Sequence, residues 1–275
     1  MTRRPSTVCL TFDFDALSVW LAYDRPTPAM LGRGEYGARV GVPRILDLLR
    51  SHGIRATFFV PGHTIDSFPE ETASILAAGH EVAHHSYAHV DPSGQTRAEE
   101  REDMERAWAA LERIGVTPLG FRSPSADLSD ATLELVEDLG FVYDSSLMAD
   151  DYRPFRPRIG DRVARGVPLE RGRDARLWEL PLSFELDDWV HFQFNFDPYR
   201  RGGSPPSDVL EIWRAEFDWM HANVDGGVLT FTLHPQVIGR GSRIAMLDTL
   251  IRHTGEAGAR FAAMSDVARE LEEAA

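Results

Sequence analysis

The chain has 275 residues, of which 43% are hydrophobic, 26% charged and 10% aromatic. This composition excludes a disordered, collagen-like or low-complexity protein, and the length allows a large core without disulfides. With 29 basic and 43 acidic residues the net charge is −14, so we expect no nucleic-acid partner. The basic residues counted here are all arginines, which excludes a Schiff-base lysine and the lysine of a P-loop.

Cys9 is the single cysteine, which excludes an internal disulfide and a cysteine-based zinc site. Residues Met1–Thr7 are polar, and no apolar run of signal-peptide length follows them. No window reaches the ~18 apolar residues of a membrane span. We therefore expect a cytoplasmic protein without a membrane partner.

Short apolar segments rich in Phe, Val, Leu and Thr are predicted to be strands. In chain order they are Val8–Phe12, Ala56–Val60, Glu81–His85, Leu119–Phe121, Phe141–Asp144, Leu177–Leu180, Val228–Leu233 and Arg260–Ala263. Between most of them lie amphipathic helical patterns, several of which end at a glycine, a common helix stop. The predicted helices are Val42–His52, Pro69–Ala78, Arg97–Ile114, Ala131–Leu139, Ser207–Asn223 and Ser242–Thr254, the last two each opened by a serine.

This alternation predicts an α/β fold with parallel strands and helices outside them. A doubly wound sheet and a (β/α) barrel both fit. No G-x-G-x-x-G turn follows the first strand, and the number of units favours a barrel of seven or eight parallel strands. We expect a single catalytic domain over residues 1–275, with its site at the carboxyl ends of the strands.

Two segments lack a helical or strand period. Ala22–Arg39 is rich in proline and glycine, and Ala149–Arg176 is rich in arginine and proline. Both follow strands that carry candidate site residues. We therefore expect substrate-binding loops over the barrel mouth rather than disordered segments.

Asp13 and Asp15 stand where the first strand ends, in the sequence Thr-Phe-Asp-Phe-Asp. Because strand side chains alternate, both carboxylates are predicted to point to one face, and Phe12 and Phe14 to the other. Two carboxylates placed together repel each other unless a cation or a proton lies between them. A solvated polar strand end is the alternative.

His85 and His89 form an H-x-x-x-H pair directly after a predicted strand. Residues at this spacing on a helix or a tight turn share a face, which suits two ligands of one metal ion. With an aspartate they would make a set of three ligands that leaves positions open for water and substrate.

His234 follows the apolar strand Val228–Leu233, and Arg122 ends another strand. A histidine after a strand is often structural, but the carboxyl end of a barrel strand favours a catalytic role. Arg122 is either a surface arginine or the partner of a buried carboxylate whose pKa it holds down.

Together these residues resemble the polysaccharide deacetylase family, the carbohydrate esterases that share a chitooligosaccharide-deacetylase homology domain. The T-F-D-D motif of the family is similar to residues 11–15, H-[ST]-x-x-H to residues 85–89, R-x-P to residues 122–124, and the final leucine–histidine strand to residues 233–234. The fourth motif, an Asp near a Trp, is matched by Asp144 or by Asp187-Asp188-Trp189. The resemblance spans residues 8–267 and implies a distorted barrel.

Phe14 separates two aspartates that are usually adjacent in this family. This spacing, with Glu35-Tyr36-Gly37 before residues 39–44, is closer to a subgroup of intracellular peptidoglycan-deacetylase-like proteins, cyclic-imide hydrolases and allantoinases that need no metal. Alignment on the Thr-Phe-Asp triplet makes Asp13 the base and Asp15 the ligand; the exchanged assignment is the alternative.

The resemblance implies hydrolysis of a carbon–nitrogen bond other than a peptide bond. Its cofactor would be a divalent metal, first of all Zn²⁺, held by Asp15, His85 and His89. Asp13 would be the general base, kept ionised by Arg122, and protonated His234 the general acid. A backbone N–H near Ser125 would stabilise the oxyanion.

The expected substrate is an N-acetylated sugar or a small cyclic amide, imide or ureide. We favour a small cytosolic amide over a cell-wall polymer, because loops that close over a site exclude water. Substrate contacts are predicted for Glu35, Tyr36, Ser125, Asp188 and Trp189. A homo-oligomer is expected as one possible assembly, and an inactive carbohydrate-binding relative is the remaining alternative.

Overall fold

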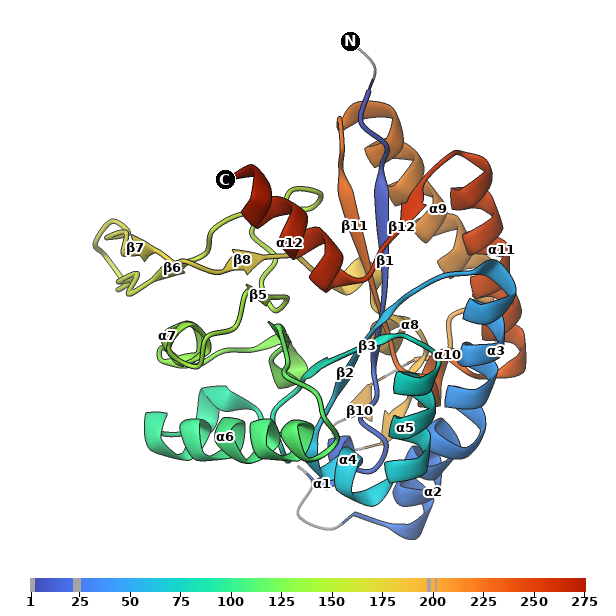
Figure 1. Cartoon of the computed structure of the whole chain (residues 1–275), viewed down its shortest axis with the longest axis horizontal. Coiled ribbons are helices and arrows are strands. Elements are labelled where there is room, and N and C mark those ends of the chain that lie inside the picture. Colours follow the sequence, from blue (N-terminus) through green and yellow to red (C-terminus); the bar gives the residue numbers. More distant parts are fainter. Residues whose placement is uncertain (1–2, 22–25, 197–198, 201) are drawn as a thin grey trace.

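A parallel sheet curls through the centre of the molecule, which a computed structural model describes over residues 3–21, 26–196, 199–200 and 202–275 (Figure 1). Its strands are β1 (Thr7–Asp13), β2 (Thr57–Val60), β3 (Glu81–His84), β4 (Gly120–Phe121), β5 (Tyr143–Asp144), β8 (Trp178–Glu179), β11 (Val228–Leu233) and β12 (Arg260–Phe261). Their order is β11-β1-β2-β3-β4-β5-β8, with β12 beside the start of β1. All these pairings are parallel, which confirms the predicted distorted (β/α) barrel.

The curled sheet is not closed by a full strand pairing between β8 and β11 in the described part of the chain. A parallel bridge between Asp187 and Thr232 links the two sides near the carboxyl end of β11. Near its amino end, the Val228 N–H donates to the Tyr152 carbonyl at 2.9 Å.

Helices cover the outside of the sheet (Figure 1). They are α1 (Ser18–Leu21), α2 (Pro28–Tyr36), α3 (Val42–His52), α4 (Gly62–Ser67), α5 (Pro69–Ala77), α6 (Arg97–Arg113), α7 (Thr132–Asp138), α8 (Asp188–Phe192), α9 (Pro206–Asn223), α10 (Pro235–Ile238), α11 (Gly241–Glu256) and α12 (Met264–Ala274). Each predicted helix is present. Ser207 and Ser242 lie one residue inside α9 and α11 rather than capping them.

Local sequence explains several of these boundaries. Thr96 and Glu99 form a reciprocal capping box at the start of α6. Gly53 ends α3 with φ +64°, a conformation that costs residues with a Cβ atom. All seven residues of β1 are buried, as expected for a parallel strand covered on both faces.

Shorter elements complete the fold. The 3₁₀ turns are Pro92–Gly94, Pro124–Ala126 and Phe184–Leu186, and Gly37–Gly41 forms a π-helix, η1. Two antiparallel pairs lie outside the main sheet: β6 (Arg158–Ile159) with β7 (Arg173–Asp174), and β9 (Asn195–Phe196) with β10 (Tyr199–Arg200).

The prediction of a loop over Ala22–Arg39 is wrong for most of that segment. Residues 22–25 lie outside the described residues, but α2 and η1 make 28–41 helical. Thr27 caps α2 by accepting the Met30 N–H, and Pro28 occupies the first turn. Glycine is a poor helix former, but close packing against the loop after β1 requires it here. A Cβ atom on Gly34 would lie 2.4 Å from the Ala16 carbonyl oxygen.

The prediction that Ala149–Arg176 covers the barrel mouth is also wrong. Besides the contact of Tyr152 with the first residue of β11, Arg156 pairs with Glu272 of α12 at 2.7 Å. The backbone N–H groups of Met264 and Ser265, which open α12, donate to Thr57 and Glu81 at the amino ends of β2 and β3. The segment therefore runs toward the end of the barrel opposite the expected site.

No helix in the described part of the chain is long and apolar enough to cross a membrane.

Candidate active site

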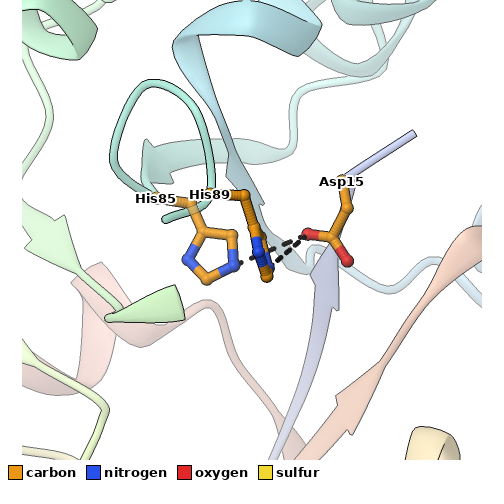
Figure 2. Close-up of side chains that lie close together, drawn as sticks. All are labelled: Asp15, His85 and His89. Atoms are coloured by element: carbon orange, nitrogen blue, oxygen red, sulfur yellow. Dashed lines mark ion pairs between the residues drawn. The ribbon is translucent and has the colours of Figure 1, made fainter. Parts of the chain in front are cut away.

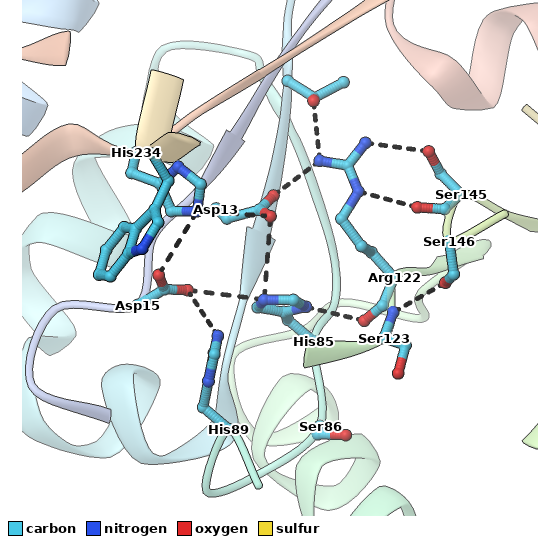
Figure 3. Close-up of polar contacts among 12 residues, drawn as sticks. Asp13, Asp15, His85, Ser86, His89, Arg122, Ser123, Ser145, Ser146 and His234 are labelled. Atoms are coloured by element: carbon cyan, nitrogen blue, oxygen red, sulfur yellow. Dashed lines mark hydrogen bonds and ion pairs between the residues drawn. The ribbon is translucent and has the colours of Figure 1, made fainter. Parts of the chain in front are cut away.

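Six titratable side chains from different strand ends converge at the carboxyl edge of the sheet (Figure 3). They are Asp13 and Asp15 from the end of β1, His85 and His89 from the turn after β3, Arg122 after β4 and His234 after β11. All six are buried, with exposures from 0% to 8%. The structure thus brings together every residue for which the sequence predicted a catalytic or metal-binding role.

Asp15, His85 and His89 present their polar atoms to one point (Figure 2). Asp15 Oδ1 lies 3.5 Å from His85 Nε2 and 3.6 Å from His89 Nε2. In a tetrahedral zinc site with bonds of about 2.1 Å, neighbouring donor atoms lie roughly 3.4 Å apart. These separations fit a metal centre.

The protonation of the three groups fits a metal as well. His85 Nδ1 must donate to the Arg122 carbonyl, 2.7 Å away, so Nε2 carries the free lone pair. Burial lowers the pKa of His85, and lowers that of His89 to about 3, which keeps both rings neutral. Asp15 Oδ1 accepts no hydrogen bond from any described residue, although it is buried. Such an orphaned acceptor is where a cation would compensate the lost hydration.

Asp15 also shows the cost of an uncompensated carboxylate. Burial raises the pKa of Asp15 to about 8, opposed by the charge of His234 and aided by that of Asp13. Gln236 donates to Asp15 Oδ2 at 3.3 Å, which leaves Oδ1 facing the two histidines.

The H-x-x-x-H pair is a tight turn and not a helix. Ser86 and His89 both adopt φ of +56°, which is unusual for residues with a side chain. Asp103 of α6 holds this turn by accepting the backbone N–H groups of Tyr87 and Ala88 at 2.7 and 3.2 Å.

Positive φ angles at residues other than glycine gather at this edge of the barrel. Besides Ser86 and His89 they occur at Ala16, Ser125 and Ala126. These residues lie in the loops after β1, β3 and β4. Strain of this kind is common where side chains must be aimed at a site.

Asp13 is held by an arginine. Arg122 Nη1 donates to Asp13 Oδ1 at 2.7 Å and to Thr11 Oγ1 at 2.8 Å. Burial alone would raise the pKa of Asp13, but the positive charges of Arg122 and His234 outweigh it and hold that pKa below the ordinary value. The carboxylate is therefore ionised at neutral pH, and its second oxygen, Oδ2, faces His85 at 3.9 Å and His234 at 4.0 Å.

His234 is oriented by Asp188, the first residue of α8. Its Nδ1 lies 2.7 Å from Asp188 Oδ1, and its backbone N–H donates to the same carboxylate. Burial would lower the pKa of His234, but Asp188 and Asp187 raise it to about 10. The protonated ring then presents Nε2–H to the cluster, 3.9 Å from Asp15 Oδ2.

Of the two candidates for the fourth motif, the Asp187-Asp188-Trp189 segment reaches the site. The Trp189 ring packs against His234 with ring centres 5.1 Å apart. Asp188 is fully buried and contacts His234. The predicted direct contact of Asp188 with a substrate does not fit this position. Asp144 lies at the end of β5, where it accepts a hydrogen bond from Ser146.

The remaining predicted contact residues lie at the periphery. Tyr36 donates to the Gly239 carbonyl, and the Arg240 guanidinium stacks on its ring at 3.7 Å. Glu35 is exposed on α2, and Ser125 is exposed in the turn after β4. Their roles toward a substrate stay predictions.

Sequence reasoning missed Gln236, Thr11 and Ser145. Ser145 accepts two hydrogen bonds from Arg122, through its carbonyl and its Oγ. All three residues stand at or next to strand ends that carry predicted site residues, and that position is the signal that could have found them. His84, adjacent to the pair, is structural: its Nε2 donates to the Met104 carbonyl and its Nδ1 accepts the Ser86 N–H.

Comparison with known proteins agrees with this geometry. The family described as Polysaccharide deacetylase matches residues 2–143. The chain is 32% identical to a peptidoglycan deacetylase of Helicobacter pylori, over 94% of each chain. A provisionally named polysaccharide deacetylase from Mycobacterium smegmatis superposes with a TM-score of 0.86 at 35% identity, over 99% of this chain and 92% of that one. The PuuE allantoinase superposes with a TM-score of 0.75 at 25% identity, over 96% and 88%. The chain therefore belongs to the polysaccharide deacetylase family, and it is a hydrolase that acts on carbon–nitrogen bonds other than peptide bonds.

Proposed function

We propose that this protein is a metal-dependent amide hydrolase, and that residues 1–275 are one catalytic domain. Asp15, His85 and His89 would hold the metal, and Zn²⁺ suits two imidazoles and one carboxylate best. The observation that carries the proposal is the buried Asp15 Oδ1, which accepts no hydrogen bond from the described residues and lies between two neutral imidazole nitrogens. A divalent metal at these atoms would supply a Lewis acid for the carbonyl and would lower the pKa of water.

Asp13 is the general base in this proposal. Its Oδ1 is bound to Arg122, while its Oδ2 faces the cluster and can take a proton from the attacking water. The exchanged assignment is less consistent with the geometry, because Asp15 faces both imidazoles and Asp13 faces the guanidinium.

His234 is the general acid. Protonated through its contact with Asp188, it gives the Nε2 proton to the departing nitrogen as the carbon–nitrogen bond breaks. Water thereby contributes its oxygen to the carboxylic acid product, and the nitrogen leaves as a neutral amine or amide.

We propose a small amide-type molecule as substrate, ahead of a polymer. The near-complete burial of the six side chains favours a substrate that enters an enclosed site. The π-helix η1 adds to the enclosure, because a Cβ on Gly37 would lie 3.0 Å from Gln236. N-acetylated amino sugars remain the second candidate, since the Helicobacter pylori relative is named a peptidoglycan deacetylase. The cytoplasmic location and the homo-oligomer stay predictions.

A hydrolysis screen tests both candidates. The zinc-loaded protein would be assayed against N-acetylated sugar oligomers and against hydantoins, cyclic imides and allantoin. We expect turnover of at least one small amide or imide. Turnover of chitin oligomers without any small amide would overturn the preference for a small substrate, and no turnover of either class by the metal-loaded protein would contradict the proposed activity.

A further inference from the structure

Asp144 and Glu179 are a pair of buried carboxyl groups outside the six-residue cluster. They end β5 and β8 and are register partners in the parallel pairing of these strands. Both are 0% exposed. Asp144 Oδ2 and Glu179 Oε2 each accept no hydrogen bond from any described residue. Two ionised carboxylates in such a place would repel each other, and both oxygens would lack a donor.

One proton between the two groups removes both problems, because it turns one unpaired oxygen into a donor and the other into its acceptor. We propose that Asp144 and Glu179 share one proton, and that this carboxyl pair positions Arg122 and, through Arg122, Asp13. Burial raises the pKa of both groups, and for Glu179 the neighbouring Asp144 raises it further.

The other oxygens of the pair hold the loop that receives Arg122. Glu179 Oε1 accepts the backbone N–H groups of Ser146 and Leu147, each at 2.9 Å. Asp144 Oδ1 accepts the Ser146 hydroxyl at 2.7 Å, and the same hydroxyl accepts the Ser123 N–H at 2.9 Å. The pair thus fixes Ser146 and Leu147, and through Ser146 it holds Ser123, the residue that follows Arg122.

Arg122 depends on this loop for two of its contacts. Its Nε donates to the Ser145 carbonyl at 3.0 Å and its Nη2 to the Ser145 hydroxyl at 2.9 Å, while Nη1 reaches Asp13 (Figure 3). The guanidinium is therefore aimed at Asp13 by the loop on one side and by Thr11 on the other.

The charged surroundings of the pair agree with one remaining negative charge. Arg122, which follows β4, lowers the pKa of Asp144, and so does the hydrogen bond with Glu179 of β8. On the other side of β8, Phe155 and Glu179 exchange backbone hydrogen bonds, each donating its N–H to the carbonyl of the other. One carboxylate facing one guanidinium, which also serves Asp13, avoids an excess of buried charge.

The shared proton can be tested by stability measurements, without an assay of enzyme activity. A carboxyl group that is protonated in the folded state and ionised in the unfolded state makes stability fall as pH rises toward its folded pKa. We expect the unfolding free energy of Glu179→Gln and of Asp144→Asn to lose this slope. Each variant should release about one proton fewer on unfolding than the wild type between about pH 6 and pH 8.

In each variant the amide N–H donates to the remaining carboxylate, so neither change leaves a cavity. Glu81→Gln is the matched control, because Glu81 is buried but accepts hydrogen bonds from Thr57, Tyr143 and Ser265. Urea unfolding followed at several pH values measures the difference. If the slope of the unfolding free energy against pH is unchanged in both variants, the pair holds no proton. If each single variant still releases a proton from the remaining carboxyl group on unfolding, the wild-type pair holds two protons rather than one.

The positioning of Arg122 rests on the proposed function and needs a second measurement. Glu179→Ala removes the acceptor for two backbone N–H groups, so we expect kcat to fall about tenfold or more with KM and metal content near the wild-type values. Glu179→Gln should restore kcat to within about threefold, since its carbonyl oxygen replaces the lost acceptor.

The two measurements fail in different ways. Equal kcat values for Glu179→Ala and the wild type would overturn the positioning role and leave the proton result untouched. If Glu179→Ala does not fold, loss of activity in a folded, metal-loaded Glu179→Gln variant would overturn it instead. Absence of turnover by the wild type itself would count against the proposed function and not against the shared proton.

Discussion

Asp188 and His234 link the two sides of the open barrel at its carboxyl edge, with Oδ1 and Nδ1 2.7 Å apart. Because Asp188 opens α8 and His234 follows β11, this contact joins the segment after β8 to the last long strand. It sets both the orientation and the charge of the proposed acid.

Replacing Asp188 should therefore change the pH dependence of the reaction. In the wild type we expect activity to rise through the lowered pKa of Asp13 and to fall as His234 loses its proton at high pH. Asp188→Asn removes the charge that raises the pKa of His234. The alkaline limb of kcat/KM should move to lower pH, and kcat should fall by about 10²-fold.

The same substitution has a consequence for stability. A histidine whose pKa is raised to about 10 in the folded state contributes stability that is complete below its ordinary pKa and is lost as pH rises through the folded value. Asp188→Asn should weaken this pH dependence, because Asp188 contributes most of the charge that raises the pKa of His234. Asp187→Asn is the control, because Asp187 lies 3.7 Å from His234 Nδ1 and mainly caps α8. Equal shifts of the alkaline limb in both variants would refute the special role of Asp188.

Metal binding should depend on the two histidines. His85→Ala and His89→Ala each remove one of three donors, so we expect a loss of bound zinc by elemental analysis after dialysis. His63→Ala changes a histidine outside the cluster and should leave the metal content unchanged. Full zinc retention in both ligand variants would place the metal elsewhere.

The two aspartates should respond differently to removal of charge. Asp13→Asn should keep the metal and lose about 10²–10⁴-fold in kcat, because the amide cannot accept the proton of water. Asp15→Asn should lose metal affinity first. Metal content and kcat measured on both variants decide between the assignments, and the reverse pattern would exchange base and ligand.

Gln236 should support the metal site through Asp15. Gln236→Leu removes the donor to Asp15 Oδ2, so that the carboxylate loses its fixed orientation. Loss of such an outer contact weakens metal affinity by about 10–100-fold. Competition with a zinc chelator measures the metal affinity. Gln95→Leu is the control, because it makes the same substitution outside the site, directly after the turn Pro92–Gly94. Wild-type affinity in Gln236→Leu would show that the 3.3 Å contact is incidental.

The strands of the main sheet, six of the helices and the members of the six-residue cluster can be predicted from the sequence alone. The predicted bounds of Val42–His52 and Val228–Leu233 equal the observed ones, because an amphipathic period ending at Gly53 and a continuous apolar run are local properties. The six residues of the cluster are predictable because parallel strands place their carboxyl ends at one edge of the sheet.

The way in which these side chains divide their contacts depends on the tertiary structure. From the sequence, Asp144 and Asp188 are both candidates for the aspartate of the fourth motif. In the structure β5, which carries Asp144, lies five strands away from β11 in the sheet order. The bridge between Asp187 and Thr232 instead brings Asp188 to His234. Likewise α2 and η1 form in a glycine-rich segment because the glycines allow close packing on the loops that follow β1 and β11. Contacts between residues that lie far apart along the chain leave no local period in the sequence, and so the sequence could not predict them.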